Sequence, residues 1–151
     1  MILFEIRSNK KIIDSDFIIK TICNQTELES VIGDINVLIN QFNSEYVWDN
    51  MFNTNDVISR ILENQTLFIL YYKENPIGYV FFKKMKNNSY FGYNLYVTKK
   101  TKRPKYAAYW FYNNVTNIIL RNSERIEVQV DDWNWSIIDI IKNIGYYKID
   151  K

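Results

Sequence analysis

One segment limits the fold of this chain more than any other, the apolar run from Ser89 to Val97. Side chains alternate between the two faces of a β-strand, and apolar or aromatic residues occupy both sets of positions here. A strand with two apolar faces needs cover on both sides, so it should lie centrally in a sheet. The alternation assigns Tyr90, Gly92, Asn94 and Tyr96 to one face and Phe91, Tyr93, Leu95 and Val97 to the other.

Further strands and helices are indicated on both sides of this segment. β-prone runs predict a hairpin over 66–72 and 77–83 and short strands at 2–7, 17–22, 125–130 and 146–149. Apolar residues at helical spacing predict helices over 26–42, with Thr26 and Glu29 as a capping box, and over about 54–64, 104–121 and 133–144. We therefore expect one α/β (α+β) domain over 1–151, with a mixed, mostly antiparallel central sheet flanked by helices.

Composition narrows the function classes. A formal net charge of +2 is too small for the broad positive field of a general DNA-binding protein, so any basic function must be local. The chain has no histidine and only Cys23 as a cysteine, which excludes zinc sites built from His and Cys, and we expect a buried structural thiol and no metal. No stretch of about 18 apolar residues occurs, so we expect a cytoplasmic protein without a membrane segment.

Three local patterns, in this order and spacing, resemble the GNAT superfamily of N-acetyltransferases. They are Asn75-Pro76-Ile77-Gly78-Tyr79 before the third core strand, Leu95-Tyr96-Val97 at the end of the fourth, and Asn134 followed by a helix and Gly145-Tyr146. The resemblance implies acetyl-CoA as the acyl donor and an amine, on a small molecule or a protein, as the acceptor. It also implies a V-shaped opening between the fourth and fifth strands that holds the donor.

The resemblance assigns the donor site to the end of this strand and the basic stretch after it. In the family the pantetheine pairs with the fourth strand's backbone and the pyrophosphate rests on the next helix's N-terminus. The family's phosphate-loop spacing, counted from Val97, puts Lys105 at the first glycine and Ala107 at the second small position. The acetyl-CoA-binding residues that the resemblance implies are Leu95, Tyr96, Val97, Lys102, Arg103, Lys105, Tyr106, Ala107 and Asn134.

The catalytic positions of the family are altered in this sequence. The family commonly uses a glutamate on the fourth strand as a base and a tyrosine on the last helix as an acid. Residues 89–98 contain no carboxylate, and Ile141 stands where that tyrosine is expected. If the chain is catalytic, we expect the acid and base among Tyr93, Tyr96 and Asp131, with Asp132 beside the last of these.

Plainer interpretations stay open for these residues. Tyr93 and Tyr96 can be packing residues, Asp131-Asp132 a polar turn, and Lys99 to Lys105 a solvated loop. The aromatic residues Tyr46, Trp48 and Phe52 either line a substrate pocket or close the core.

Three functions are compatible with the sequence. The first is an acetyl-CoA-dependent N-acetyltransferase, and the second a catalytically inactive module of the same fold that binds CoA or a protein. The third is a small nucleic-acid-binding domain, which the low net charge disfavours. A homodimer is also open.

Overall fold

The computed structural model describes residues 1–46 and 52–150, and Trp48 lies outside them. The described residues form a seven-stranded sheet in the order β2-β3-β4-β5-β6-β1-β7. Among the described strands, only β5 and β6 pair in parallel. The elements are β1 (Ile2–Ile6), β2 (Phe17–Ile22), α1 (Gln25–Ser30), α2 (Ile32–Glu45), α3 (Thr54–Leu62), β3 (Thr66–Tyr72), β4 (Asn75–Met85), β5 (Ser89–Val97), α4 (Pro104–Leu120), β6 (Arg125–Val130), α5 (Trp135–Ile144) and β7 (Tyr147–Lys148).

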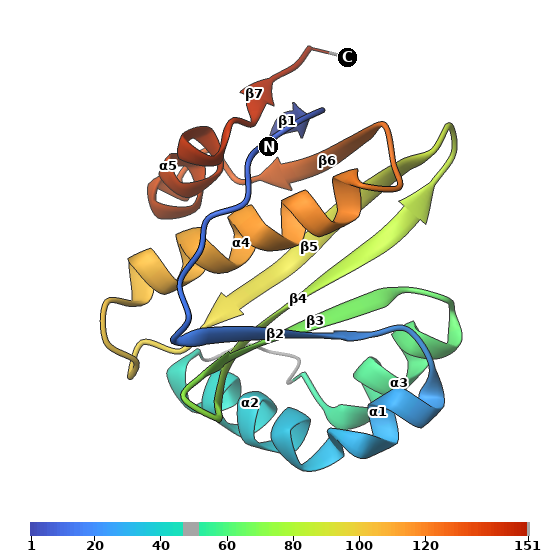
Figure 1. The fold of residues 1–151 in the computed structure, drawn as a ribbon, viewed down its shortest axis with the longest axis vertical. Helices are drawn as coiled ribbons and strands as arrows, with labels where there is room; N and C mark the ends of the chain where they lie inside the picture. Colours follow the sequence, from blue (N-terminus) through green and yellow to red (C-terminus); the bar gives the residue numbers. More distant parts are fainter. Residues whose placement is uncertain (47–51, 151) are drawn as a thin grey trace.

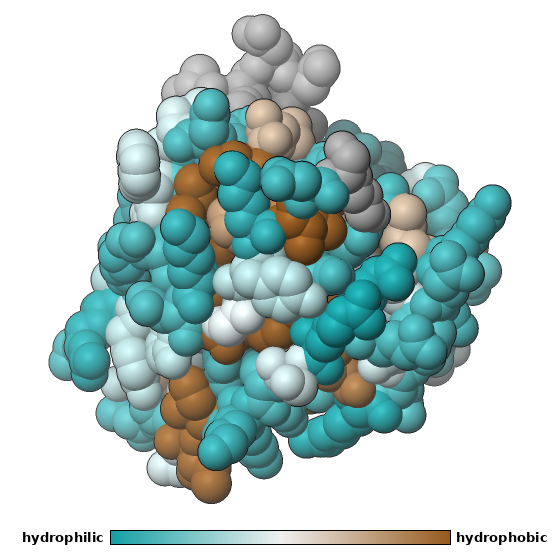
Figure 2. All heavy atoms as spheres, turned by 90° about the horizontal axis from the view of Figure 1, so that it is seen from above, coloured by the Kyte–Doolittle hydropathy of each residue, from teal (hydrophilic) through white to brown (hydrophobic). Residues whose placement is uncertain are grey.

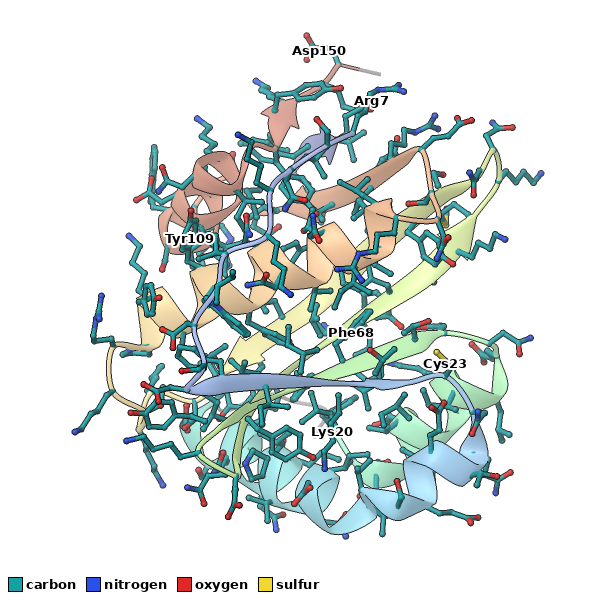
Figure 3. The ribbon with its side chains drawn as sticks, viewed as in Figure 1. Arg7, Lys20, Cys23, Phe68, Tyr109 and Asp150 are labelled. Carbon is teal, nitrogen blue, oxygen red and sulfur yellow. The ribbon has the colours of Figure 1, made fainter. Side chains whose placement is uncertain are left out.

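Helices cover both faces of this sheet (Figure 1). On one face α4 and α5 enclose an apolar cluster that includes Phe82 and Phe111, and Phe68 points into it from β3 (Figure 3). On the other face α1, α2 and α3 pack over a second cluster that includes Leu38 and Phe81. The predicted fold class, a mostly antiparallel mixed sheet flanked by helices, is confirmed.

The first strand of the chain completes the sheet beside its last ones. β1 pairs antiparallel with β6 over Ile2–Ile6 and, on its other edge, with the short β7. The first and last strands of the described chain therefore lie side by side (Figure 1). Viewed from this end, the apolar areas of the surface are separated by hydrophilic side chains (Figure 2).

The structure differs from the sequence prediction in the bounds of one predicted helix, in its cap residue and in the exposure of Cys23. The helix predicted over 26–42 is two helices, which separate at Val31 (φ −123°, ψ 14°). Asn24, not Thr26, caps the first, because its side chain accepts a hydrogen bond from the Glu27 N–H at 2.9 Å. Cys23, predicted to be buried, is exposed, because it lies between the end of β2 and this cap (Figure 3).

A β-bulge changes the faces of β5. Tyr79 pairs with Tyr96 and Phe81 with Tyr93, so two residues of β5 lie opposite the single Val80 of β4. Asn94 in the bulge has φ 55°. The predicted strict alternation is therefore wrong after Tyr93: Tyr93 and Tyr96 both face α1–α3, and Leu95 and Val97 face α4.

Gly92 of β5 permits a close approach of α4. A Cβ atom at this position would lie 2.6 Å from the Tyr112 hydroxyl and 2.7 Å from Cε1 of Phe82. Gly92→Ala is therefore expected to destabilise the protein by about 1–3 kcal/mol through overpacking. Urea denaturation measures the change, and adding Tyr112→Phe should recover part of the loss. A single variant as stable as the wild type would contradict this packing.

Candidate functional site

The strands β5 and β6 pair over only part of their length. Their parallel register runs from Ser89↔Arg125 to Gly92↔Val128, and the bulge at Asn94 follows directly. Among the described residues, no strand pairs with the last part of β5, Tyr93 to Val97, on the β6 side. The two strands thus separate toward their carboxyl ends, and the end of β5 leaves one backbone edge available for a ligand.

The amino end of α4 follows this opening in the chain and lacks a side-chain cap. Arg103, the N-cap residue, has a left-handed backbone (φ 49°, ψ 60°), and Pro104 begins the helix without an N–H. The first intrahelical bond runs from the Ala107 N–H to the Arg103 carbonyl at 3.0 Å. The N–H groups of Lys105 and Tyr106 therefore have no helical acceptor, which together with the helix dipole favours an anion.

The three basic side chains around this helix end, Lys102, Arg103 and Lys105, have different surroundings. Lys105 points to α5, where its Nζ lies 3.4 Å from Asp139, so it leaves the helix end clear. The guanidinium of Arg103 stacks on the Tyr106 ring at 4.4 Å, and Lys102 is exposed. Beside them, an open hollow of about 340 Å³ lies between α4 and α5 (Tyr109 in Figure 3), lined by Lys105, Tyr106, Tyr109, Ile140 and Asn143.

Other predicted donor-site residues have structural roles in the fold. Asn134 is the N-cap of α5, and its side chain accepts from the Ile137 N–H at 3.4 Å. Ala107 is fully buried on the sheet-facing side of α4, and the Tyr106 hydroxyl donates to Asp14 at 3.0 Å. Their contacts with a donor molecule stay predictions.

Glu45, at the last residue of α2, was not found by sequence reasoning. Its carboxylate accepts hydrogen bonds from the Tyr96 hydroxyl at 2.9 Å, the Thr98 hydroxyl at 2.6 Å and the Lys99 N–H at 2.9 Å. Burial opposes the ionised form, but these bonds outweigh it and lower the pKa of Glu45. Glu45 thus holds the end of β5 and the start of the basic loop against α2. No local sequence pattern predicts a contact over this distance along the chain.

The predicted catalytic residues do not converge on one point. Tyr96 donates to Glu45, whereas the Tyr93 hydroxyl donates to Gln65, and burial raises the pKa of both phenols, so they keep their protons at neutral pH. Asp131 is exposed and follows β6, at the edge where β5 also ends. Ile141 is buried, with 1% of its surface exposed.

Two carboxylates lie side by side on β6, which borders the opening, and on its neighbour β1. Glu127 of β6 is in register with Phe91 of β5 and with Glu5 of β1, so all three share one sheet face. Arg125 and Arg7 lie 3.7 and 3.6 Å from Glu127 and Glu5. Sequence reasoning searched only residues 89–98 for a carboxylate; the polar alternation of Arg125, Glu127 and Gln129 was the signal that could have led to Glu127.

No protein-family model matches the sequence, and no curated protein sequence matches it. Solved structures do match. A GNAT-family acetyltransferase from Staphylococcus aureus Mu50 has 15% identity and a TM-score of 0.62, over 89% of this chain and 87% of its own. An acetyltransferase from Streptococcus agalactiae 2603 has 13% identity and a TM-score of 0.60, over 91% and 87%.

A third similar structure is a domain of a larger enzyme. It is the C-terminal DUF2156 domain of a protein named as a lysylphosphatidylglycerol synthetase, from Agrobacterium fabrum, with 6% identity and a TM-score of 0.59. The match covers 74% of this chain but only 35% of that one. At these identities the likeness shows a shared fold, that of the GNAT acetyltransferases, as the resemblance in the sequence implied.

Two further observations bear on partners. In the described part of the chain, no helix is both long and apolar enough to cross a membrane. Residues 1–46 and 52–150 also contain no group of three or more Cys, Asp or Glu side chains placed to hold a metal ion.

Proposed function

We propose that this chain, which has the fold of the GNAT acetyltransferases, transfers an acetyl group from acetyl-CoA to an amine. The observation that carries the proposal is the separation of β5 from β6 after Gly92, with the uncapped amino end of α4 beyond it. An extended chain fits the free edge of β5, and a pyrophosphate fits the free N–H groups of the helix.

The described residues fit acetyl-CoA in two ways. The backbone of Leu95, Tyr96 and Val97 would pair with the pantetheine amides, which need donors and acceptors along an open strand edge. The N–H groups of Lys105 and Tyr106 would receive the pyrophosphate, and Lys102 and Arg103 would add charge-assisted hydrogen bonds. Bound in this way, acetyl-CoA supplies an activated thioester.

The transfer needs one proton removed and one supplied. The amine nitrogen bonds to the thioester carbonyl carbon, the carbon–sulfur bond breaks, and the nitrogen loses a proton while the leaving thiolate gains one. Tyr96 and Tyr93, as phenols that remain protonated, suit the proton donor, and the Asp131 carboxylate suits the acceptor. For an amine that is already neutral, holding the two reactants together supplies a large share of the acceleration.

Two measurements, made one after the other, test the proposal. Acetyl-CoA at 100 times its Kd should stabilise the fold by about 2.7 kcal/mol, which appears as a higher melting temperature, while an oligonucleotide should have no effect. Thiol release from acetyl-CoA over a panel of amines then measures transfer. An unchanged melting temperature with acetyl-CoA would end the proposal.

A second candidate function is a module that binds CoA or a protein without catalysis. The specific observation in its favour is Ile141, a buried aliphatic side chain at the position where the family has a proton-donating tyrosine. Acetyl-CoA binding without thiol release on any amine of the panel would favour this candidate over the enzyme.

The basic loop gives a sharper prediction for donor binding. Replacing Lys102, Arg103 and Lys105 together by alanine should weaken acetyl-CoA affinity at least about tenfold, because charge-assisted contacts to phosphates are lost. It should also make the affinity less sensitive to salt. Isothermal titration at two salt concentrations measures both effects.

A matched control is available at the other end of β5. Lys83, Lys84 and Lys86 are exposed around the β4–β5 turn, and their triple alanine variant changes the net charge equally. Equal losses of affinity in both triple variants would show a general charge effect. They would refute the assignment of the phosphate site to the amino end of α4.

A further inference from the structure

Arg60, in the last turn of α3, is held on the sheet face opposite to α4. Its Cζ lies 4.5 Å from the ring centre of Phe81 and 5.0 Å from those of Phe52 and Tyr93. We call these three rings the aromatic clamp. Because cation–π contacts fix a flat guanidinium against the rings, the clamp holds the direction of the Arg60 side chain in advance of any ligand.

The hydrogen-bonding capacity of Arg60 is mostly unused. Its Nη1 donates to Oδ1 of Asn94 at 2.9 Å, which is one of five N–H donors on a guanidinium. Within residues 1–46 and 52–150, ion pairs form at Arg7, Lys105 and Arg125 but not at Arg60. A partly buried guanidinium that, among the described residues, has free donors and no carboxylate partner favours an anion from outside.

The place where Arg60 is anchored links it to the opening between β5 and β6. Asn94 is the bulge residue of β5 and follows two positions after Gly92, the last residue of β5 that pairs with β6. The chain then passes through the basic loop to α4, which lies on the other face of the sheet. Acetyl-CoA held at α4 and an anion held by Arg60 would therefore approach the opening from opposite faces of the sheet.

Two carboxylates lie on the same sheet face as Arg60, on the strands beyond β5. Glu127 and Glu5 lie on the same sheet face as Phe91, and the Phe91 and Tyr93 rings stack on that face at 6.3 Å. Tyr93, under Arg60, and Glu127 are offset by one strand spacing of about 4.8 Å and by two residues, about 6.6 Å, along the strands, so the two charged side chains are separated by on the order of 10 Å. A small amino acid that makes a hydrogen bond of about 2.9 Å at each end spans a similar length.

We propose that Arg60 binds the carboxylate of the acceptor, so that the acceptor is an amino acid or a similar amine bearing a carboxylate. The amino end of such a molecule lies toward Glu127 and, if it arrives as an ammonium, loses one proton to solvent before the neutral nitrogen attacks the thioester. This inference rests on the proposed acetyl transfer for the identity of the acceptor. The carboxylate site itself can be measured without transfer.

Pairs of acetyl acceptors that differ only in the carboxylate test the proposed carboxylate site directly. Glycine, L-leucine and L-phenylalanine are compared with methylamine, isoamylamine and 2-phenylethylamine, which lack only the carboxylate. The wild type should prefer each amino acid by about 10- to 100-fold in kcat/KM, the worth of hydrogen bonds to a charged group. Arg60→Gln should lose this preference through a raised KM for the amino acid, with the KM for acetyl-CoA and the rate on the plain amines retained.

Two further variants separate binding from folding. Arg60→Lys keeps a cation over the aromatic clamp but loses the bidentate geometry, so it should fold and retain only part of the preference. Arg121→Gln removes an exposed arginine at the far end of α4 and should keep the whole preference. No preference in the wild type, or an undiminished one in both Arg60 variants, overturns the inference.

A binding measurement distinguishes failure of this inference from failure of the proposed function. The same amino acids are titrated by calorimetry without acetyl-CoA. Binding to the wild type that is at least about tenfold weaker in Arg60→Gln supports the carboxylate site even if no acetyl-CoA binds. If acetyl-CoA binds and no amino acid does, the carboxylate site is refuted and the proposed function stands.

Discussion

Glu45→Ala is expected to destabilise the protein by about 2–4 kcal/mol, because hydrogen bonds to a charged group contribute about 1.5–3 kcal/mol and the buried Tyr96 hydroxyl loses its acceptor. The same change releases Thr98 and the Lys99 N–H, where the basic loop begins. Affinity for acetyl-CoA should therefore fall together with stability. Urea denaturation and calorimetric titration of acetyl-CoA measure the two effects.

Matched glutamate variants show whether the effect belongs to this site. Glu29 is exposed on α1, so Glu29→Ala should change stability by less than about 0.5 kcal/mol. Glu45→Gln keeps an acceptor oxygen but removes the charge, and we expect a loss between those of the other two variants. Equal stability of Glu45→Ala and Glu29→Ala would show that the carboxylate does not hold the strand end.

The pH dependence of stability provides an independent readout of the same carboxylate. Burial would raise the pKa of Glu45, but the bonds from Lys99, Thr98 and Tyr96 lower it below its ordinary 4.5. A carboxylate with a lowered pKa stabilises the fold above its unfolded pKa, and this stabilisation is lost as the pH falls through the folded pKa. The difference in stability between wild type and Glu45→Gln should therefore shrink as the pH falls below about 4.5.

The parts of the fold that depend on local patterns were predictable. The hairpin β3–β4, the strand β5 and the helices α4 and α5 follow from apolar periodicity and from turn and cap residues within a few positions of each end. The order of these elements supported the resemblance to the GNAT acetyltransferases, and the structural comparisons confirmed that the fold is shared. Arg60 itself lies in a predicted helix, but only the fold brings it against three rings and Asn94.

The features that escaped prediction depend on contacts distant in sequence or on backbone geometry. Glu45 meets partners more than fifty positions away, and β1 meets β6 and β7 from the opposite end of the chain. The bulge at Asn94 needs a residue that accepts positive φ, which asparagine does more readily than most, yet asparagine is frequent in this sequence. A frequent residue gives little signal, so the faces of β5 after Tyr93 were assigned wrongly.

Gly78→Ala should have a large effect, because the obstacle at this position is backbone. Gly78 of β4 pairs with Val97 at the end of β5, and a Cβ atom there would lie 2.5 Å from the Tyr96 carbonyl oxygen. A side chain can rotate away from such a contact, but a strand carbonyl moves only with its strand. We expect a loss of about 3 kcal/mol or more, at or above the upper end of ordinary overpacking.

Gly33→Ala is the matched control, since Gly33 lies in α2 and, apart from the nearby backbone of that helix, no described atom lies within 4 Å of the place that an alanine methyl group would take. Alanine in a helix is favoured over glycine, so this variant should gain about 0.5–1 kcal/mol. The two glycine variants thus make the same chemical change with opposite signs, and urea denaturation compares them. Because Gly78 faces the part of β5 that would pair with pantetheine, its variant should also weaken acetyl-CoA binding, which Gly33→Ala should leave unchanged. Equal stability of the two variants would mean that β4 and β5 are not held as closely at the opening as the structure has them.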